Sequence, residues 1–326
     1  MSVLPPTTLK LGSLELSSPF VLAPLESVSD CAFRRLCWEQ GAAFTWTEMV
    51  RARGIVRNNK STLDLIDTHD PDVPTGLQLL VTSEAELQSA LDIVERLANT
   101  THPHFKNIRA VDLNFGCPSP DVIKIGAGPA MLKRRAKLEL IFTALKGFKE
   151  RTSLPIGAVG AKIRLGLHGG EQAAKVFLPV VDLANQFLDY LTVHARHARE
   201  QSKDVPSWSA IRESKDRARI PIIGNGDVFG RAEWEKLFNK SKCDGALIAR
   251  GAIRSPWVFR ALKQQGAGQP TPEELTIAEA RYFALARQHG SKEKFVNWHT
   301  EGFKRIRARL EGGVEDLSLP RNENLS

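Results

Sequence analysis

The sequence predicts an α/β fold, a (β/α)8 TIM barrel with a short C-terminal helical appendage. Eight short, almost wholly apolar runs recur along the first 255 residues, and helical patterns separate them. Strands that are apolar throughout are typical of a parallel sheet covered on both faces. Eight strand-plus-helix units in roughly 250 residues match a TIM barrel, whereas the competing doubly wound sheet would show GxGxxG after its first strand, which is absent. The runs begin at Pro19, Ala42, Thr75, Ala110, Ile156, Tyr190, Ile220 and Gly245.

The segments around these runs predict the remaining parts of the fold. Residues 9–16, LKLGSLEL, predict a hairpin that plugs the N-terminal end of the barrel, and residues 83–98, 137–150 and 170–187 predict helices. GAGQPTP, at 266–272, is typical of a linker, and two short helical patterns follow it. About forty residues of helix cannot form a core alone, so we expect the appendage to dock on the barrel. The chain therefore divides into a barrel domain at 1–264, a helical appendage at 265–312 and a disordered tail at 313–326.

Composition excludes several classes of protein. Of the 326 residues, 42% are hydrophobic and 25% are charged, which is ordinary for a globular chain and excludes a disordered or collagen-like one. No apolar stretch approaches the roughly 20 residues that cross a membrane, and no signal peptide pattern opens the chain. The four cysteines form no CxxC pair, so neither a disulfide scaffold nor a metal site is indicated. We therefore expect a cytoplasmic protein without a membrane segment.

Charge favours an anionic partner. The net charge is +8, and between Arg281 and Leu310 eight basic residues face two acidic ones. Such a surface attracts a polyanion or an acidic substrate. Aromatic residues among these charges, Phe295, Trp298 and Phe303, are spaced to bury one helix face. The other face would present cations to the phosphates of a polyanion, although a solvated helical face is the plainer alternative; these cations are Lys294, Lys304, Arg305, Arg307 and Arg309.

The ends of the predicted strands carry the candidate site, because barrel enzymes place their chemistry there. Residues 225–227, Asn-Gly-Asp, and 249–251, Ala-Arg-Gly, follow the seventh and eighth strands, where TIM barrels bind phosphate. Each loop alone could equally be a tight turn. Gln78, Lys162 and His194 end three other strands and could together hydrogen-bond the edge of a flavin ring.

Six motifs follow one another between about Pro19 and Phe259. They are residues 23–34 (APLESVSDCAFR), 114–118 (NFGCP) with 126–132 (GAGPAML), 162–164 (KIR), 193–196 (VHAR), 224–228 (GNGDV) and 248–252 (IARGA). Together they resemble the tRNA-dihydrouridine synthase family, which implies an FMN enzyme that uses NADPH to reduce the C5–C6 double bond of uridine in RNA, with tRNA as the expected RNA. Such a substrate would supply the phosphates for the cations of the predicted C-terminal helix. The family commonly has Gly where this chain has Ala195, at the turn after the sixth strand.

The resemblance also implies roles for single residues. Cys117 takes the position of the cysteine that protonates C5 of the uracil, and a thiol with a pKa near 8.5 keeps its proton at neutral pH. Asn114, Arg164 and Arg196 would face the substrate. The other positions would bind FMN: Pro24, Leu25 and Glu26 through the backbone, Gln78, Lys162 and His194 at the ring, and Asn225, Gly226, Asp227, Ala249, Arg250 and Gly251 at the phosphate.

Two other functions stay open at this point. One is an FMN-dependent barrel oxidoreductase acting on a small enone or a dihydroorotate-like metabolite, which would need no basic appendage. The other is an RNA-binding barrel that has lost its chemistry, against which Cys117, Lys162 and His194 argue. The residues do not distinguish tRNA from rRNA, one uridine position from another, or NADPH from NADH, and they indicate neither a protein partner nor an oligomeric state.

Overall fold

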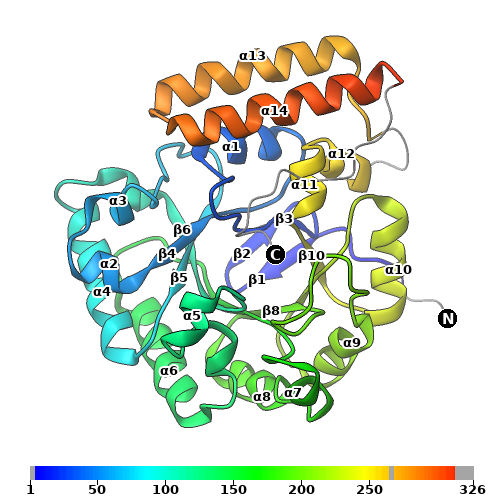
Figure 1. Cartoon of the computed structure of the whole chain (residues 1–326). Helices are drawn as coiled ribbons and strands as arrows, with labels where there is room; N and C mark the ends of the chain where they lie inside the picture. The colour runs from blue at the N-terminus through cyan, green and yellow to red at the C-terminus, as the bar shows by residue number, and fades with distance from the viewer. Residues whose placement is uncertain (1–3, 264–267, 313–326) are drawn as a thin grey trace.

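Eight parallel strands form a barrel in the computed structural model, which describes residues 4–263 and 268–312 (Figure 1). The strand order is β3-β10-β9-β8-β7-β6-β5-β4. The two outermost strands also meet, because Leu22 N donates to Phe44 O and Ala43 N to Phe20 O, both at 2.9 Å. The predicted TIM barrel is thereby confirmed. The strands are β3 Phe20–Leu22, β4 Thr45–Arg51, β5 Thr75–Leu80, β6 Ile108–Phe115, β7 Ala158–Ile163, β8 Tyr190–His194, β9 Ile222–Asn225 and β10 Gly245–Ile248.

Helices follow the strands and cover the outside of the barrel. Ser83 begins one of them as predicted, since its side chain accepts a hydrogen bond from Glu86 N. The single helix predicted at 170–187 is instead two helices, because Lys175 adopts a left-handed φ of 53° and Pro179 opens the second. The helices are α1 Cys31–Glu39, α2 Ala52–Val56, α3 Lys60–Leu63, α4 Glu84–Ala98, η1 Pro103–Asn107, α5 Pro120–Lys124, η2 Gly128–Met131, α6 Arg135–Arg151, α7 Gly169–Ala173, α8 Leu178–Phe187, α9 Trp208–Arg217, α10 Arg231–Ser241, α11 Arg250–Arg254 and α12 Val258–Lys263.

A hairpin lies across the N-terminal end of the barrel, as predicted. Its strands are β1, Leu9–Leu11, and β2, Leu14–Leu16. Ser13 N donates to Gly157 O at 2.9 Å, and Gly157 directly precedes β7. The hairpin therefore leaves only the opposite end, where the strands finish, open for a site.

Two aromatic side chains fill the interior of the barrel below that open end. Trp46 from β4 and Tyr190 from β8 have ring centroids 6.1 Å apart. Each lies against a glycine on a neighbouring strand: a Cβ at Gly76 would lie 2.1 Å from the Trp46 ring, and one at Gly160 would lie 2.2 Å from the Tyr190 ring. The two glycines therefore make room for a floor of aromatic rings beneath the site.

The appendage is a pair of helices, α13 (Pro272–His289) and α14 (Glu293–Leu310), which lies against α1 at the top of Figure 1. Tyr282 donates to Asp30 Oδ2 at 3.2 Å, and His299 Nε2 contacts Val28 O at 2.8 Å. Phe295 and Phe303 are buried. The expected docking is confirmed, with helices of 18 residues each. The domain boundary predicted at 264/265 and the tail predicted at 313–326 lie outside the described residues.

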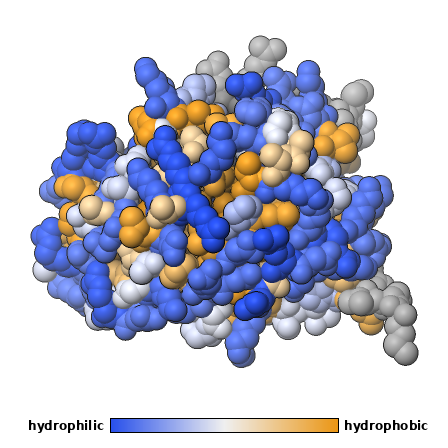
Figure 2. Space-filling view, turned by 90° about the horizontal axis from the view of Figure 1, so that it is seen from below, coloured by the Kyte–Doolittle hydropathy of each residue, from blue (hydrophilic) through white to orange (hydrophobic). Residues whose placement is uncertain are grey.

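The surface seen from below the view of Figure 1 is mostly hydrophilic, with smaller hydrophobic areas between the charged residues (Figure 2). In the two described ranges, no helix has both the length and the apolar character needed to cross a membrane.

Candidate active site

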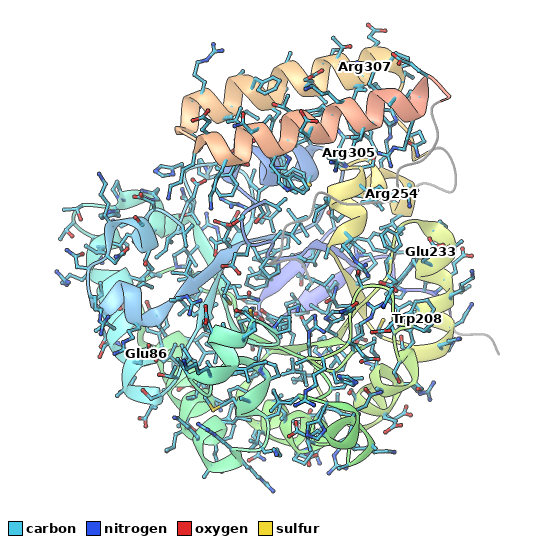
Figure 3. The ribbon with its side chains drawn as sticks, viewed as in Figure 1. Glu86, Trp208, Glu233, Arg254, Arg305 and Arg307 are labelled. Carbon is cyan, nitrogen blue, oxygen red and sulfur yellow. The ribbon has the colours of Figure 1, made fainter. Side chains whose placement is uncertain are left out.

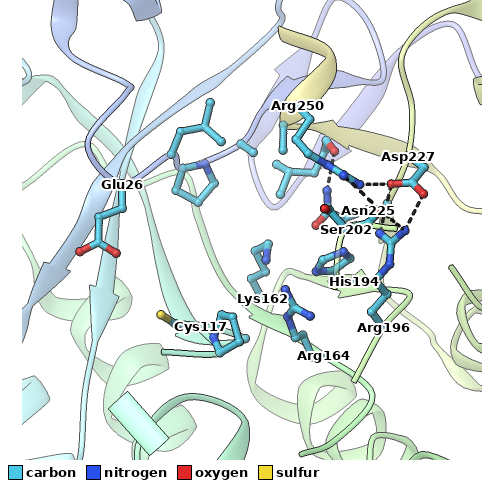
Figure 4. A pocket seen from close by; sticks show the side chains of 18 of the residues that line it. Glu26, Cys117, Lys162, Arg164, His194, Arg196, Ser202, Asn225, Asp227 and Arg250 are labelled. Carbon is cyan, nitrogen blue, oxygen red and sulfur yellow. Dashed lines mark hydrogen bonds and ion pairs between the residues drawn. The ribbon is translucent and has the colours of Figure 1, made fainter. Parts of the chain in front are cut away.

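A pocket opens at the C-terminal ends of the strands, and the predicted site residues meet in it (Figure 4). Successive side chains of a strand point to opposite faces, so residues two apart, such as Lys162 and Arg164, share the inner side. The loop at 200–202 also lines the pocket, which sequence reasoning missed. All sixteen residues expected at the cofactor or the substrate line it: Pro24, Leu25, Glu26, Gln78, Asn114, Cys117, Lys162, Arg164, His194, Arg196, Asn225, Gly226, Asp227, Ala249, Arg250 and Gly251.

One end of the pocket is built from backbone. Gly226 and Asp227 have positive φ angles of 130° and 54°, and a Cβ on Gly251 would lie 2.4 Å from Val228 O. Asn225 Nδ2 donates to Leu247 O at 2.8 Å and ties the end of β9 to β10. Within the described ranges, the N–H groups of 226–228 and 250–251 have no acceptor. This end therefore presents free backbone donors, the arrangement that binds an anion.

Two arginines share one carboxylate at the same end. The Arg196 guanidinium is buried and pairs with Asp227 at 2.5 Å, and Arg250 pairs with the other oxygen of Asp227. Both arginines also donate to Ser202 O, at 3.4 and 3.2 Å. Figure 4 shows this network on the far side of the pocket from Cys117. Arg196, predicted to face the substrate, is thus engaged in holding the loop at 200–204 against the anion-binding end.

The middle of the pocket carries two buried cations, Lys162 and Arg164. Burial and the neighbouring Arg164 lower the pKa of Lys162 to about 8, against the opposing charge of Asp112, and its ammonium has no hydrogen-bond acceptor among the described residues. Burial also lowers the pKa of Arg164 to about 10; its Nη1 donates to His197 O at 3.0 Å, while its buried Nε has no partner. Burial and these cations lower the pKa of His194 well below its usual range, so the imidazole is neutral. The two buried cations therefore favour a ligand whose edge carries negative charge or electron-rich atoms.

Cys117 lies in a tight loop after β6. Asn114 Oδ1 accepts from Gly116 N at 3.0 Å and from Cys117 N at 2.8 Å. Gly128, with φ of +57°, packs so closely that a Cβ would lie 2.9 Å from Cys117 O. Burial raises the pKa of the Cys117 thiol. The thiol is therefore protonated at neutral pH and can act as an acid.

A buried chain of hydrogen bonds lies below these groups. Asn114 Nδ2 donates to Gln78 Oε1, and Gln78 Nε2 donates to Asp112 Oδ2, both at 2.8 Å. Tyr190 donates to Asp112 Oδ1 at 2.9 Å. Sequence reasoning missed Asp112 and Tyr190, although a lone Asp two residues before Asn114 in an apolar strand was a signal, since alternation puts both on one face.

The turn after β3 forms another side of the pocket. Val28 N and Ser29 N both donate to Leu25 O, at 3.1 and 3.0 Å, and residues 24–26 of this turn line the pocket. Ser27 has a positive φ of 61°, and its N–H donates to the Glu48 carboxyl group. Burial raises the pKa of Glu48 to about 7.

The cations predicted on α14 differ in their surroundings. Arg307 pairs with Glu279 of α13 at 2.5 Å, and Arg309 donates to Arg254 O at 2.5 Å. Lys304 is exposed and meets only Glu301 of its own helix, at 2.7 Å. Figure 3 shows Arg305 on the side of α14 toward the barrel and Arg307 on the side toward α13. Lys294 reaches Ser27 Oγ at 3.3 Å, and Ser27 follows Glu26 of the pocket lining. Arg307 thus ties α14 to α13 within the appendage, and Arg309 ties α14 to Arg254 at the end of α11.

The described residues contain no set of metal-ligating side chains. Within residues 4–263 and 268–312, no group of three or more His, Cys, Asp or Glu side chains could hold a metal ion.

Solved structures share the barrel. Histamine dehydrogenase from Rhizobium sp. 4-9 aligns with a TM-score of 0.56 and 11% identity, over 85% of this chain and 50% of that one. A mutant of morphinone reductase in complex with tetrahydroNAD aligns with a TM-score of 0.50 and 13% identity, over 80% and 92%. These similarities concern the fold.

Sequence comparisons are more specific. A protein named probable tRNA-dihydrouridine synthase from Mycobacterium tuberculosis (strain CDC 1551 / Oshkosh) is 29% identical, over 93% of this chain and 79% of its own. Proteins of the same name from Aquifex aeolicus (strain VF5) and Rickettsia conorii (strain ATCC VR-613 / Malish 7) are 32% and 27% identical, over 75% and 96% of this chain and 72% and 93% of theirs. The family model described as Dihydrouridine synthase (Dus) matches residues 21–315. Because that match takes in the barrel, the pocket and both appendage helices, the chain belongs to the dihydrouridine synthase family.

Proposed function

We propose that this chain reduces the C5–C6 double bond of uridine in tRNA to 5,6-dihydrouridine, with FMN as its cofactor and NADPH as the reductant. One observation carries the proposal. The protonated thiol of Cys117 and the acceptor-free ammonium of Lys162 face the same pocket, whose far end is a cradle of free backbone N–H groups. The cytoplasm holds both tRNA and NADPH, so we expect the reaction there.

The donor set fits FMN. A flavin mononucleotide needs hydrogen-bond donors around its phosphate and a cation near the edge of its ring. The backbone of 226–228 and 250–251, with Arg250 beside it, would hold the phosphate. Lys162, whose ammonium lacks an acceptor, would lie at the ring edge with Gln78 and neutral His194. Residues 24–26 would contact the ring through their backbone.

The chemistry is then divided between two faces of the uracil. Reduced FMN, when bound, supplies the hydride that adds to C6. Cys117 donates the proton to C5 from the other side, and the raised pKa of its thiol keeps that proton available at neutral pH. Lys162 would stabilise negative charge at the ring edge, because burial leaves its own charge poorly screened.

Two further residues would orient the uracil. Asn114 uses its oxygen and one N–H within the chain, which leaves its second N–H for a uracil carbonyl. Arg164 lines the pocket, and its buried Nε has no hydrogen-bond partner among the described residues. For Arg196 we propose an indirect role, since its guanidinium is taken up by Asp227 and the 200–204 loop.

RNA binding would fall to the appendage at 265–312 and catalysis to the barrel at 1–264. Lys304 is exposed, Lys294 contacts Ser27, and Arg305 lies on the side of α14 toward the barrel; from these positions they could meet phosphates. Such contacts position RNA without reading its sequence, and they offset the few kcal/mol needed to extrude a base.

The experiment follows the flavin. We expect purified protein to be yellow and to release one FMN on heat denaturation. Anaerobic NADPH should bleach it, and unmodified tRNA transcript should restore the colour and yield dihydrouridine. Cys117→Ala is the control that should bleach but not recover. If a small enone reoxidises the flavin and tRNA does not, the proposed substrate is wrong.

A further inference from the structure

A one-directional chain of hydrogen bonds connects the floor of the barrel to the loop that carries Cys117. It runs from the Tyr190 hydroxyl through Asp112, Gln78 and Asn114 to the backbone N–H of Gly116 and Cys117. The four side chains come from β5, β6 and β8 and are all at least nine-tenths buried. None of the predicted functions used Asp112 or Tyr190.

Both ends of this series of hydrogen bonds impose the same donor-to-acceptor direction. An ionised carboxylate only accepts hydrogen bonds, so Gln78 must turn its NH2 toward Asp112 and its oxygen toward Asn114. Backbone N–H groups only donate, so Asn114 must turn its oxygen toward Gly116 and Cys117 and its NH2 toward Gln78. The two amides therefore have a single arrangement that satisfies every partner. In it, both present their remaining N–H groups, rather than carbonyl oxygens, to the pocket.

Asp112 is the residue on which this arrangement depends. Its side chain is 2% exposed, and its two oxygens are used by Gln78 and Tyr190. Without a carboxylate there, Gln78 could rotate its amide by 180°. Its NH2 would then compete with the backbone N–H groups of the Cys117 loop for the Asn114 oxygen. A loop displaced by this change would carry Cys117 with it, and misplacement by about 1 Å costs up to about 100-fold in rate.

We infer that Asp112, supported by Tyr190, is a positioning residue that fixes the amide edges of Gln78 and Asn114 and holds the Cys117 loop in place. This inference rests on the proposed function, in which Gln78 meets the cofactor and Cys117 the substrate. Burial raises the pKa of Asp112 to about 6, so it remains mostly ionised at pH 7 and accepts both hydrogen bonds.

The geometry can be tested without turnover, through the thiol itself. Cys31, Cys37 and Cys243 are buried, so Cys117 is the accessible cysteine for alkylation by N-ethylmaleimide under native conditions. We expect Asp112→Leu to alkylate at least threefold faster than the wild-type protein. Asp112→Asn should stay within about twofold, since its oxygen can face Gln78 while its NH2 faces the Tyr190 oxygen. A Cys117→Ala protein supplies the background.

Tyr282→Phe is the matched control. It removes another buried Tyr–Asp hydrogen bond, the one to Asp30, between the appendage and α1. This variant should alkylate at the wild-type rate and be reoxidised by tRNA normally. Asp112→Leu should slow tRNA-dependent reoxidation by about 100-fold, while Asp112→Asn restores most of the rate.

The outcomes separate the inference from the proposed function. Cooperative unfolding would show that Asp112→Leu is folded. If this folded variant is alkylated, and its flavin reoxidised by tRNA, at the wild-type rates, the inference is overturned. If Asp112→Leu does not fold, Asp112→Asn combined with Tyr190→Phe decides: there the Asn amide loses its acceptor, and a wild-type alkylation rate overturns the inference. If the wild-type protein itself is never reoxidised by tRNA, the proposed function fails, and the alkylation series still decides the role of Asp112.

Discussion

Replacement of Lys304 and Arg305 by Gln should weaken RNA binding, whereas the same change at Arg307 and Arg309 should not. The four cations lie within six residues of one helix, so both double variants remove two charges from nearly the same place. They differ in their partners. Arg307 is bound to Glu279 and Arg309 to Arg254 O, while Lys304 is exposed and paired only within its own helix.

The magnitude follows from how many RNA phosphates lose a cationic partner. Each phosphate paired with a cation adds about 0.7–0.9 to the slope of log affinity against log salt, so two add about 1.4–1.8. Relative to 1 M salt, where ion release gives no gain, this corresponds at 0.15 M to about a 14- to 30-fold weaker complex. The Arg307/Arg309 variant should keep its salt slope within about 0.5 and instead lose about 1 kcal/mol of unfolding free energy, as two part-buried hydrogen bonds disappear.

The assay is the apparent KM for tRNA in flavin reoxidation, measured between about 0.05 and 0.3 M salt, a range over which the screening length stays on the order of 10 Å. Reduction of the flavin by NADPH serves as the internal control, since α14 contributes no residue to the lining of the pocket. Equal flattening of the salt slope in both double variants would refute the distinction drawn from the ion pairs. An unchanged slope in the Lys304/Arg305 variant would move RNA binding to the barrel.

Three further changes test the site and the docking of the appendage. Lys162→Met should lower FMN affinity yet raise the stability of the FMN-free protein at pH 7; because the folded pKa of about 8 lies below the usual 10.5, this stability gain should shrink as pH rises from 7 to 10, as urea unfolding would show. Cys117→Ala should leave flavin reduction by NADPH unchanged and slow tRNA-dependent reoxidation by about 10²–10⁴-fold in stopped-flow traces. Reoxidation at the wild-type rate would place the proton donor elsewhere. Tyr282→Phe should cost about 1 kcal/mol of unfolding free energy without changing KM for tRNA; a raised KM would show that appendage docking also sets RNA affinity.

Much of the barrel and the membership of the pocket could be predicted because both follow from local patterns. Apolar runs mark strands that are buried on both faces, and parallel strands end at one edge, so residues such as Lys162 and His194 had to meet. The helix break at Lys175 was harder to predict, since a single left-handed residue interrupts an otherwise continuous helical pattern.

Which side chains form ion pairs or hydrogen bonds with each other could not be predicted from these local patterns. A sequence shows Arg196 and Asp227 at two strand ends but not that their side chains pair across the pocket. Nor does it show that Arg307 faces α13, because the side of a helix that meets a neighbour depends on how the pair docks. Asp112 and Tyr190 lie far apart in the chain, and only the closed barrel brings them together.

The tight fit between Gly160 and the Tyr190 ring has an evolutionary consequence. Any side chain at position 160 would overlap that ring, so the glycine and the tyrosine can be exchanged only together, for a larger residue on β7 and a smaller one on β8. Such an exchange would also remove the hydroxyl that Asp112 accepts from. Descendants of this chain should therefore inherit Gly160, Tyr190 and Asp112 as a unit, or replace all three at once.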